Sequence, residues 1–80
     1  MKTDDEILKI IRELYTKMNK DPGEIMKVRS KDDDYYAKRA DGAIARIPNS
    51  LIEEYSGSSS KEAERELFKL LDSGFHMLKK

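Results

Sequence analysis

The chain has 80 residues, of which 38% are hydrophobic and 40% are charged, and its 16 basic and 16 acidic side chains give a formal net charge of zero. Residues 1–80 are enough for one small domain, and the neutral balance excludes generic polyanion binding unless charges segregate on the surface. The absence of cysteine excludes disulfides, thiolate metal sites and a cysteine nucleophile.

The first predicted element is a helix over residues 4–19. Thr3 precedes it as the N-cap, and Glu6 stands three residues later as the partner in a capping box. Apolar residues then recur at helical spacing. They are Ile7, Ile10, Ile11, Leu14 and Met18, with Leu8 and Tyr15 widening the stripe. The sequence NKDPG ends the helix because proline cannot continue it.

The middle of the chain has the two-residue period of strands. It predicts strands over residues 24–31, 35–40 and 43–48 in an antiparallel meander. The adjacent carboxylates of KDDD favour a turn between the first two strands. Asp41 and Gly42 are typical of a two-residue type I′ turn between the second and third strands.

Two further helices are predicted, over residues 50–56 and 60–79. Asn49 or Ser50 caps the first, Gly57 ends it, and SGSSS forms a flexible link. Ser59 and Glu62 form a capping box for the second, whose apolar stripe is Ala63, Leu67, Leu70, Leu71, Phe75 and Leu78. Gly74 either ends this helix after Ser73 or allows another element to approach. The fold class is therefore α+β: one small two-layer domain of order αβββαα, with the helices packed on one face of the sheet.

The expected turn at Asp41 and Gly42 sets the two faces of the hairpin. It pairs Tyr36 with Ile47 and Lys38 with Ala45. The face toward the helices then carries Tyr36, Ala40, Ala43, Ala45 and Ile47, interrupted by Lys38, and the first strand adds Met26 and Val28. A shift of one residue in the pairing would invert this assignment.

The opposite face of the sheet is the candidate binding site. Its predicted partner-binding residues are Lys27, Arg29, Lys31, Tyr35, Arg39, Ile44 and Arg46. A tyrosine on a strand can stack on a base, and arginine can bind phosphate or carboxylate in bidentate fashion. The alternative is a solvated face on which Lys and Arg keep the sheet soluble. Aspartates in the adjoining turns would partly offset the positive charge.

Catalytic and metal sites are not predicted. Asp32, Asp33 and Asp34 lack the central glycine and distal glutamate of a calcium loop. His76 is the only histidine, so it has no second histidine or cysteine with which to share a metal. The sequence contains no glycine-rich phosphate loop and no nucleophile-elbow serine. We therefore expect neither an enzyme nor a cofactor.

Part of the chain resembles a known family. The segment AIARIPNSLIEEY resembles the start of ribbon-helix-helix repressors, in which a strand with a basic-apolar-Pro ending leads into the first helix. Arg46, Ile47, Pro48 and Leu51 match that start. The resemblance implies a dimeric regulator whose strands pair between two copies. The helix that follows is too short for the family, which also lacks a preceding helix and hairpin.

The order of the elements gives two weaker resemblances. Helix, meander and helix resemble the double-stranded-RNA-binding fold and small toxins built on it. Those toxins use a histidine on a strand, and the strands predicted here contain none. Small proteins of this size and order also occur among phage-encoded inhibitors of bacterial defence systems. Both resemblances concern topology and license no activity.

These observations favour a non-catalytic binding module of the inhibitor or adaptor type, encoded by a phage or mobile element. It would act by occupying a partner protein through the basic sheet face. The alternative is a small nucleic-acid-binding transcriptional regulator, as a monomer or homodimer. No run of about 18 apolar residues and no apolar signal-peptide run occur, so we expect a cytoplasmic protein without a membrane partner.

Overall fold

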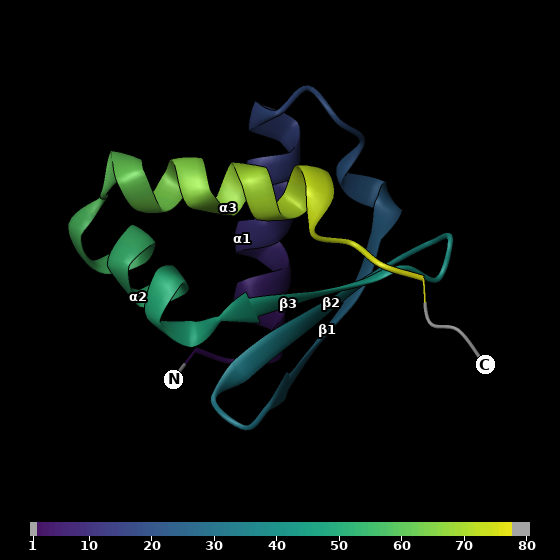
Figure 1. Cartoon of the computed structure of the whole chain (residues 1–80), viewed down its shortest axis with the longest axis horizontal. Coiled ribbons are helices and arrows are strands. Elements are labelled where there is room, and N and C mark those ends of the chain that lie inside the picture. The colour runs from purple at the N-terminus through teal and green to yellow at the C-terminus, as the bar shows by residue number, and fades with distance from the viewer. Residues whose placement is uncertain (1, 78–80) are drawn as a thin grey trace.

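The helices and strands follow the predicted order (Figure 1). The computed structural model describes residues 2–77. Its elements are α1 (Asp4–Lys17), the 3-10 turn η1 (Pro22–Glu24), β1 (Ile25–Lys31), β2 (Asp34–Arg39), β3 (Ile44–Pro48), α2 (Asn49–Ser58) and α3 (Lys61–Ser73). The strands form one antiparallel sheet in the order β1-β2-β3. The predicted α+β class and the order αβββαα are confirmed.

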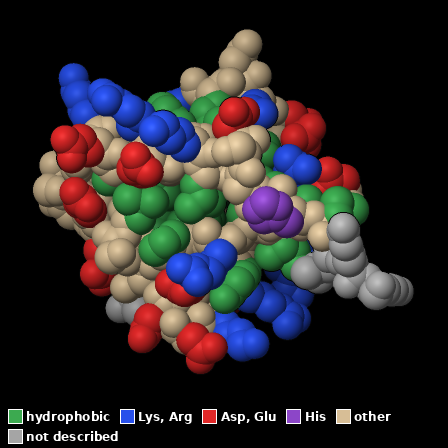
Figure 2. Space-filling view, in the orientation of Figure 1, with side chains coloured by type: hydrophobic (Ala, Val, Ile, Leu, Met, Phe, Trp, Pro, Cys, Tyr) green, Lys and Arg blue, Asp and Glu red, His purple; other side chains and the backbone are tan. Residues whose placement is uncertain are grey.

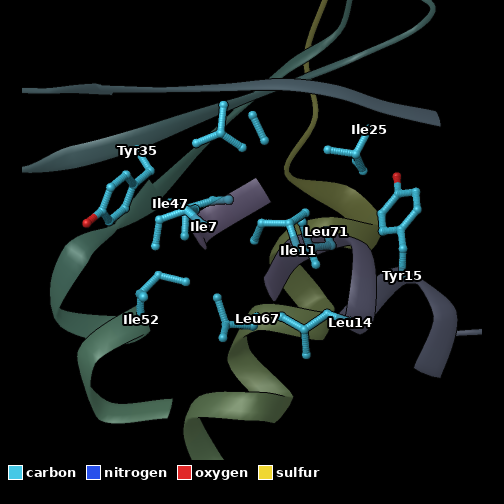
Figure 3. Close-up of a cluster of buried hydrophobic side chains, with 12 residues drawn as sticks. Ile7, Ile11, Leu14, Tyr15, Ile25, Tyr35, Ile47, Ile52, Leu67 and Leu71 are labelled. Carbon is cyan, nitrogen blue, oxygen red and sulfur yellow. The ribbon is translucent and has the colours of Figure 1, made fainter. Parts of the chain in front are cut away.

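All three helices lie against one face of the sheet. The helix α1 packs on β1 and β2, whereas α2 and α3 pack on each other and on β3. The core lies between the layers, where apolar residues of every helix meet those of the strands (Figure 3). Its largest fully buried side chains are Tyr15, Tyr35, Ile7, Ile11, Leu14, Ile25, Ile47, Ile52, Leu67 and Leu71. The sheet therefore has a covered face and an open face.

The predicted capping box of α1 is confirmed. The Glu6 amide donates to the Thr3 hydroxyl, and the Thr3 amide donates to the Glu6 carboxylate. The helix ends at Lys17, slightly earlier than predicted. Asn19 adopts a left-handed conformation, φ 61°, and the Lys20 amide donates to the Tyr15 carbonyl. Such a left-handed residue ends a helix and positions the next amide to donate to one of the last helical carbonyls.

The predicted register of the β2–β3 hairpin is wrong by one residue. Tyr36 pairs with Arg46 and Lys38 pairs with Ile44. The loop contains three residues, since the Arg39 amide donates to the Ala43 carbonyl and Gly42 donates back to Arg39. Gly42 takes the left-handed position that such a loop requires, with φ 92°. A one-residue shift exchanges the faces of a strand, so Tyr36 and Lys38 leave the predicted core face and Tyr35 enters the core.

Type I′ backbone geometry occurs at the other turn. Asp32 and Asp33 both have positive φ, 51° and 65°, and lie between the paired residues Lys31 and Asp34. A type I′ turn needs positive φ at both central positions, and aspartate tolerates that conformation better than most residues. This two-residue turn closes the β1–β2 hairpin.

The start of β1 contains a second departure from strict alternation. The pairing shifts between Ile25 and Lys27, which is the mark of a β-bulge. Ile25 is fully buried as a result, and Met26, predicted to face the core, is 57% exposed. Val28 is buried as predicted.

The link between α2 and α3 is shorter than predicted. The helix α2 continues through Gly57 to Ser58, and neither Asn49 nor Ser50 caps it. Ser59 adopts a left-handed conformation at its C-terminal end. The cap of α3 is Ser60, whose hydroxyl accepts a hydrogen bond from the Ala63 amide, and not Ser59. The sequence SGSSS is therefore mostly helix and cap.

The last helix ends at Ser73 and not at residue 79, which confirms the alternative in which Gly74 ends it. A β-carbon on Gly74 would collide with the Leu70 carbonyl oxygen, so glycine suits this sharp exit. Phe75 then packs on the core, and His76 exchanges two backbone hydrogen bonds of 2.9 Å with Ile44. Leu78, predicted to extend the apolar stripe, lies outside the described residues. No helix within residues 2–77 has the length and apolar character needed to cross a membrane.

Candidate functional site: the open face of the sheet

The side chains on the open face form three rows across the three strands. The first row is Lys31, Asp34 and Pro48, the second is Arg29, Tyr36 and Arg46, and the third is Lys27, Lys38 and Ile44. These pairings place every second residue of each strand on this face. We call these nine residues the open face.

Tyr36 occupies the centre of the open face. Its neighbours across the strands are Arg29 on β1 and Arg46 on β3. The ring is half-buried, and both arginines are exposed. A shallow hollow of about 310 Å³ lies beside it, lined by Lys27, Arg29, Tyr36, Lys38 and Ile44. The centre of the face thus offers an aromatic ring between two guanidinium groups.

Positive charge is concentrated on the open face. The face carries five of the 16 basic residues and one of the 16 acidic residues, Asp34. The rest of the chain therefore carries 11 basic and 15 acidic side chains, an excess of four negative charges. Figure 2 shows Lys and Arg side chains at the lower edge of the molecule, with Asp and Glu side chains beside them. The neutral chain is therefore a charge-segregated one.

Asp34 is the acidic member of the open face, and it contacts Arg46. The Arg46 Nε atom lies 3.4 Å from an Asp34 carboxylate oxygen. The Asp34 side chain is 24% exposed and that of Arg46 is 63% exposed. An exposed pair of this kind stabilises a protein by less than about 1 kcal/mol, so Arg46 can exchange this partner for another anion at little cost.

Five of the seven predicted site residues lie on the open face: Lys27, Arg29, Lys31, Ile44 and Arg46. Tyr35 does not. It is fully buried, and its hydroxyl donates to the Lys2 carbonyl at 3.3 Å. The one-residue shift of β2 is the reason, because it turns Tyr35 toward the helices and Tyr36 outward.

Arg39 is the second predicted site residue that the shift removes from the open face. Its guanidinium makes two hydrogen bonds to Asp41, at 2.8 and 3.2 Å, and lies 4.6 Å from the centre of the Phe75 ring. The hydrogen bond to Asp41 is the main cause that raises the pKa of Arg39 above its usual value. Arg39 therefore holds the end of the hairpin to the segment after α3.

Sequence reasoning missed Tyr36 and Lys38 as members of the open face. Both sit on β2, whose two faces were exchanged. The sequence signal for the other register lies in Ala40, Asp41 and Gly42. These residues suit a three-residue loop with glycine in the left-handed position as well as a two-residue turn. The open face is still basic and aromatic, because Tyr36 takes the place predicted for Tyr35 and Lys38 takes the place predicted for Arg39.

No group of three or more His, Asp or Glu side chains within residues 2–77 is placed to hold a metal ion. Asp32 and Asp33 are exposed in the turn, and Asp34 faces Arg46. His76 is exposed, and its backbone bonds to Ile44. The arrangement of the open face is suited to binding anions through its arginine and lysine side chains.

Comparison with family models, curated proteins and solved structures finds no match to this chain. The intramolecular pairing of β3 also departs from the ribbon-helix-helix resemblance. In that family the strand pairs between two copies, whereas here β3 pairs with β2 of the same chain. The candidate site is therefore argued from the chain's own residues.

Proposed function

We propose that the chain is a non-catalytic binding module, of the inhibitor or adaptor type, which occupies an acidic surface of a partner protein through its open face. The row Arg29, Tyr36 and Arg46 is the observation that carries this proposal. Arginine and tyrosine are enriched where protein interfaces gain most of their binding energy. Both arginines present forked donors suited to carboxylates.

The segregation of charge supports the same proposal. Complementary charge raises the rate at which two proteins associate and suppresses wrong partners. An acidic partner would be attracted to the open face and repelled by the acidic remainder of the chain. Half-buried Tyr36 and Ile44 supply apolar contact area at the centre of the basic residues.

Single-stranded nucleic acid is the second candidate ligand, because one observation favours it. Tyr36 is an aromatic ring on the central strand of an open sheet, flanked by two arginines. Proteins that bind single strands combine such rings with cations that contact the phosphates. The acidic groups elsewhere on the chain oppose a long polyanion more than they oppose a local acidic patch.

The test measures binding of labelled poly-L-glutamate and of labelled oligo-dT at about 50 mM salt. Arg29→Glu on the open face is compared with Arg65→Glu, an equal charge change on an exposed position of α3. We expect poly-L-glutamate binding that Arg29→Glu abolishes and Arg65→Glu leaves nearly unchanged. Equal losses in the two variants would contradict the proposal, because binding would then follow net charge alone.

The affinity for oligo-dT separates the two candidates. If the ligand is a nucleic acid, oligo-dT should bind tightly, and its affinity should fall steeply as salt is added. Tyr36→Phe should keep this affinity, whereas Tyr36→Ala should lose it. That combination would replace the protein partner by the second candidate. The favoured proposal predicts that oligo-dT binds more weakly than poly-L-glutamate of similar charge.

A further inference from the structure

The outer edge of β1 is an open strand edge. Lys27, Arg29 and Lys31 exchange hydrogen bonds with β2, because the pair Lys31 and Asp34 closes the two-residue turn and bonded pairs alternate from there. The N–H and C=O groups of Val28 and Ser30 therefore point away from the sheet. Within residues 2–77, β1 has no strand neighbour other than β2. Figure 1 shows β1 on the side of the sheet away from α2 and α3.

The opposite edge of the sheet is less accessible. Ile44 of β3 already exchanges both backbone hydrogen bonds with His76. Pro48 has no N–H to donate. Among the contacts of residues 2–77, Arg46 is then the one residue of β3 that keeps both outward groups available to an added strand. In the part of the chain that the structure describes, only β1 offers two outward-pointing residues in a regular stretch, Val28 and Ser30.

The side chains beside this edge select the partner. Lys27, Arg29 and Lys31 are exposed and lie on the open face at every second position of β1. A second copy that paired antiparallel on β1 would place two such basic columns side by side, which is destabilising. A strand with carboxylates at every second residue would place each carboxylate across from one cation. Directly opposed unlike charges stabilise a strand pair.

We propose that an extended acidic segment of the partner protein, with Asp or Glu at every second residue, adds to β1 as a fourth strand. Its backbone bonds to Val28 and Ser30, and its carboxylates contact Lys27, Arg29 and Lys31. This inference rests on the proposed function and specifies the partner's chemistry at the β1 side of the open face. Main-chain bonds give such added strands affinity, and alternate side chains give them specificity.

Two peptides of identical composition test the alternation. One alternates Glu and Thr, and the other holds the same residues in two blocks. We expect the alternating peptide to bind at least about fivefold more tightly, since a block places half of its carboxylates on the wrong face. Equal affinities would overturn the inference. The absence of binding would also overturn it. The side chains of Lys27, Arg29 and Lys31 would then serve only to prevent other strands from pairing with this edge.

Hydrogen exchange tests the backbone contacts directly. The amides of Val28 and Ser30 should exchange fast in the free protein and slow by at least about tenfold with saturating alternating peptide. The amides of Arg29 and Lys31 already bond to β2 and should change less. Peptide binding without slower exchange at Val28 and Ser30 would overturn strand addition.

A pair of variants at Ser30 isolates one hydrogen bond. Ser30→Pro removes the outward N–H and leaves the β1–β2 bonds intact, as is tolerated at the edge of a sheet. Ser30→Ala removes only the hydroxyl. We expect Ser30→Pro to weaken the alternating peptide by at least about fivefold and Ser30→Ala to have almost no effect. Equal affinities of the two folded variants would contradict the inference.

A charge exchange keeps the inference testable even if Ser30→Pro fails to fold. The double variant Lys27→Glu and Lys31→Glu should no longer bind the acidic alternating peptide. It should instead bind a peptide that alternates Lys and Thr.

The proposed function can fail separately from this inference. Suppose that poly-L-glutamate binds through Arg29, that the chain binds both peptides equally tightly, and that hydrogen exchange at the Val28 amide stays fast. The open face is then a binding site, and strand addition is wrong. If poly-L-glutamate does not bind, both proposals are wrong.

Discussion

Tyr36 lies directly across from Arg46, and not across from Ile47, in the central hairpin. This single pairing decides which tyrosine is in the core and which is on the open face. It depends on a loop of three residues, in which Gly42 takes a left-handed conformation that other residues rarely adopt. The stability of the hairpin and the composition of the candidate site therefore share one local cause.

Substitution of Gly42 tests this loop. Gly42→Ala should lower the free energy of unfolding by about 1 kcal/mol, because alanine is strained at φ 92°. Gly57→Ala is the matched control, since Gly57 lies within α2 with open space around it. That change should raise the free energy of unfolding by about 0.5–1 kcal/mol. Urea unfolding of both variants measures the difference, and equal effects would contradict the three-residue loop.

The carboxyl of Asp41 should make stability depend on pH. The Ala43 amide and the Arg39 guanidinium donate to it and lower its pKa below the ordinary 3.8. The folded chain then binds this proton less readily than the unfolded chain, so the stabilisation is complete above the ordinary pKa and is lost as the pH falls through the lowered pKa. Asp41→Asn cannot gain the proton. Its urea midpoint should therefore fall less than that of the parent between about pH 5 and about pH 2, and an identical decrease would contradict this role.

Phe75 should hold the segment after α3 against the sheet. Its ring meets Tyr15 edge to face, with centres 6.5 Å apart, and lies under Arg39. Phe75→Ala should lower the free energy of unfolding by about 2 kcal/mol, since a half-buried aromatic ring is removed. The Ile44 amide, bonded to His76, should lose more protection from hydrogen exchange than the Arg39 amide, bonded to Ala43. A uniform loss at both amides would show that Phe75 does not act locally.

Asp34 should compete with an acidic ligand for Arg46. Asp34→Asn removes the one carboxylate of the open face and should raise the affinity for poly-L-glutamate by roughly two- to threefold at low salt. Asp33→Asn is the control, because it makes the same charge change in the adjoining turn and asparagine also tolerates positive φ. We expect a smaller effect from the control. A larger one would show that the ligand does not contact Arg46.

Much of the fold follows from local signals in the sequence. Thr3 and Glu6 mark the start of α1, and the helical and two-residue periods assign every major element to the right class. These predictions succeed because caps and periodicity depend on neighbours in the chain. The placement of Lys27, Arg29 and Lys31 on the open face is confirmed for the same reason.

The wrong predictions occur where one additional residue in a loop, a strand or a helix cap changes the local backbone geometry. Ala40 joins the hairpin loop, Met26 sits in a bulge, and Ser60 caps α3 where Ser59 was expected. Loop length and bulges depend on contacts across the sheet, which sequence spacing does not report. Gly74 left two ends open for α3, and the segment after Ser73 packs through Phe75 against Tyr15 and Arg39, residues distant in the sequence.

The central claim is that the open face binds an acidic partner. Chemical-shift mapping of the isotope-labelled protein with poly-L-glutamate tests it most directly. We predict shifts confined to the open face and the intervening residues of β1, largest at Arg29, Tyr36, Lys38 and Arg46, that disappear in Arg29→Glu. Shifts concentrated on the exposed helical cations Lys9, Lys61 and Arg65, or the absence of shifts, would contradict the claim.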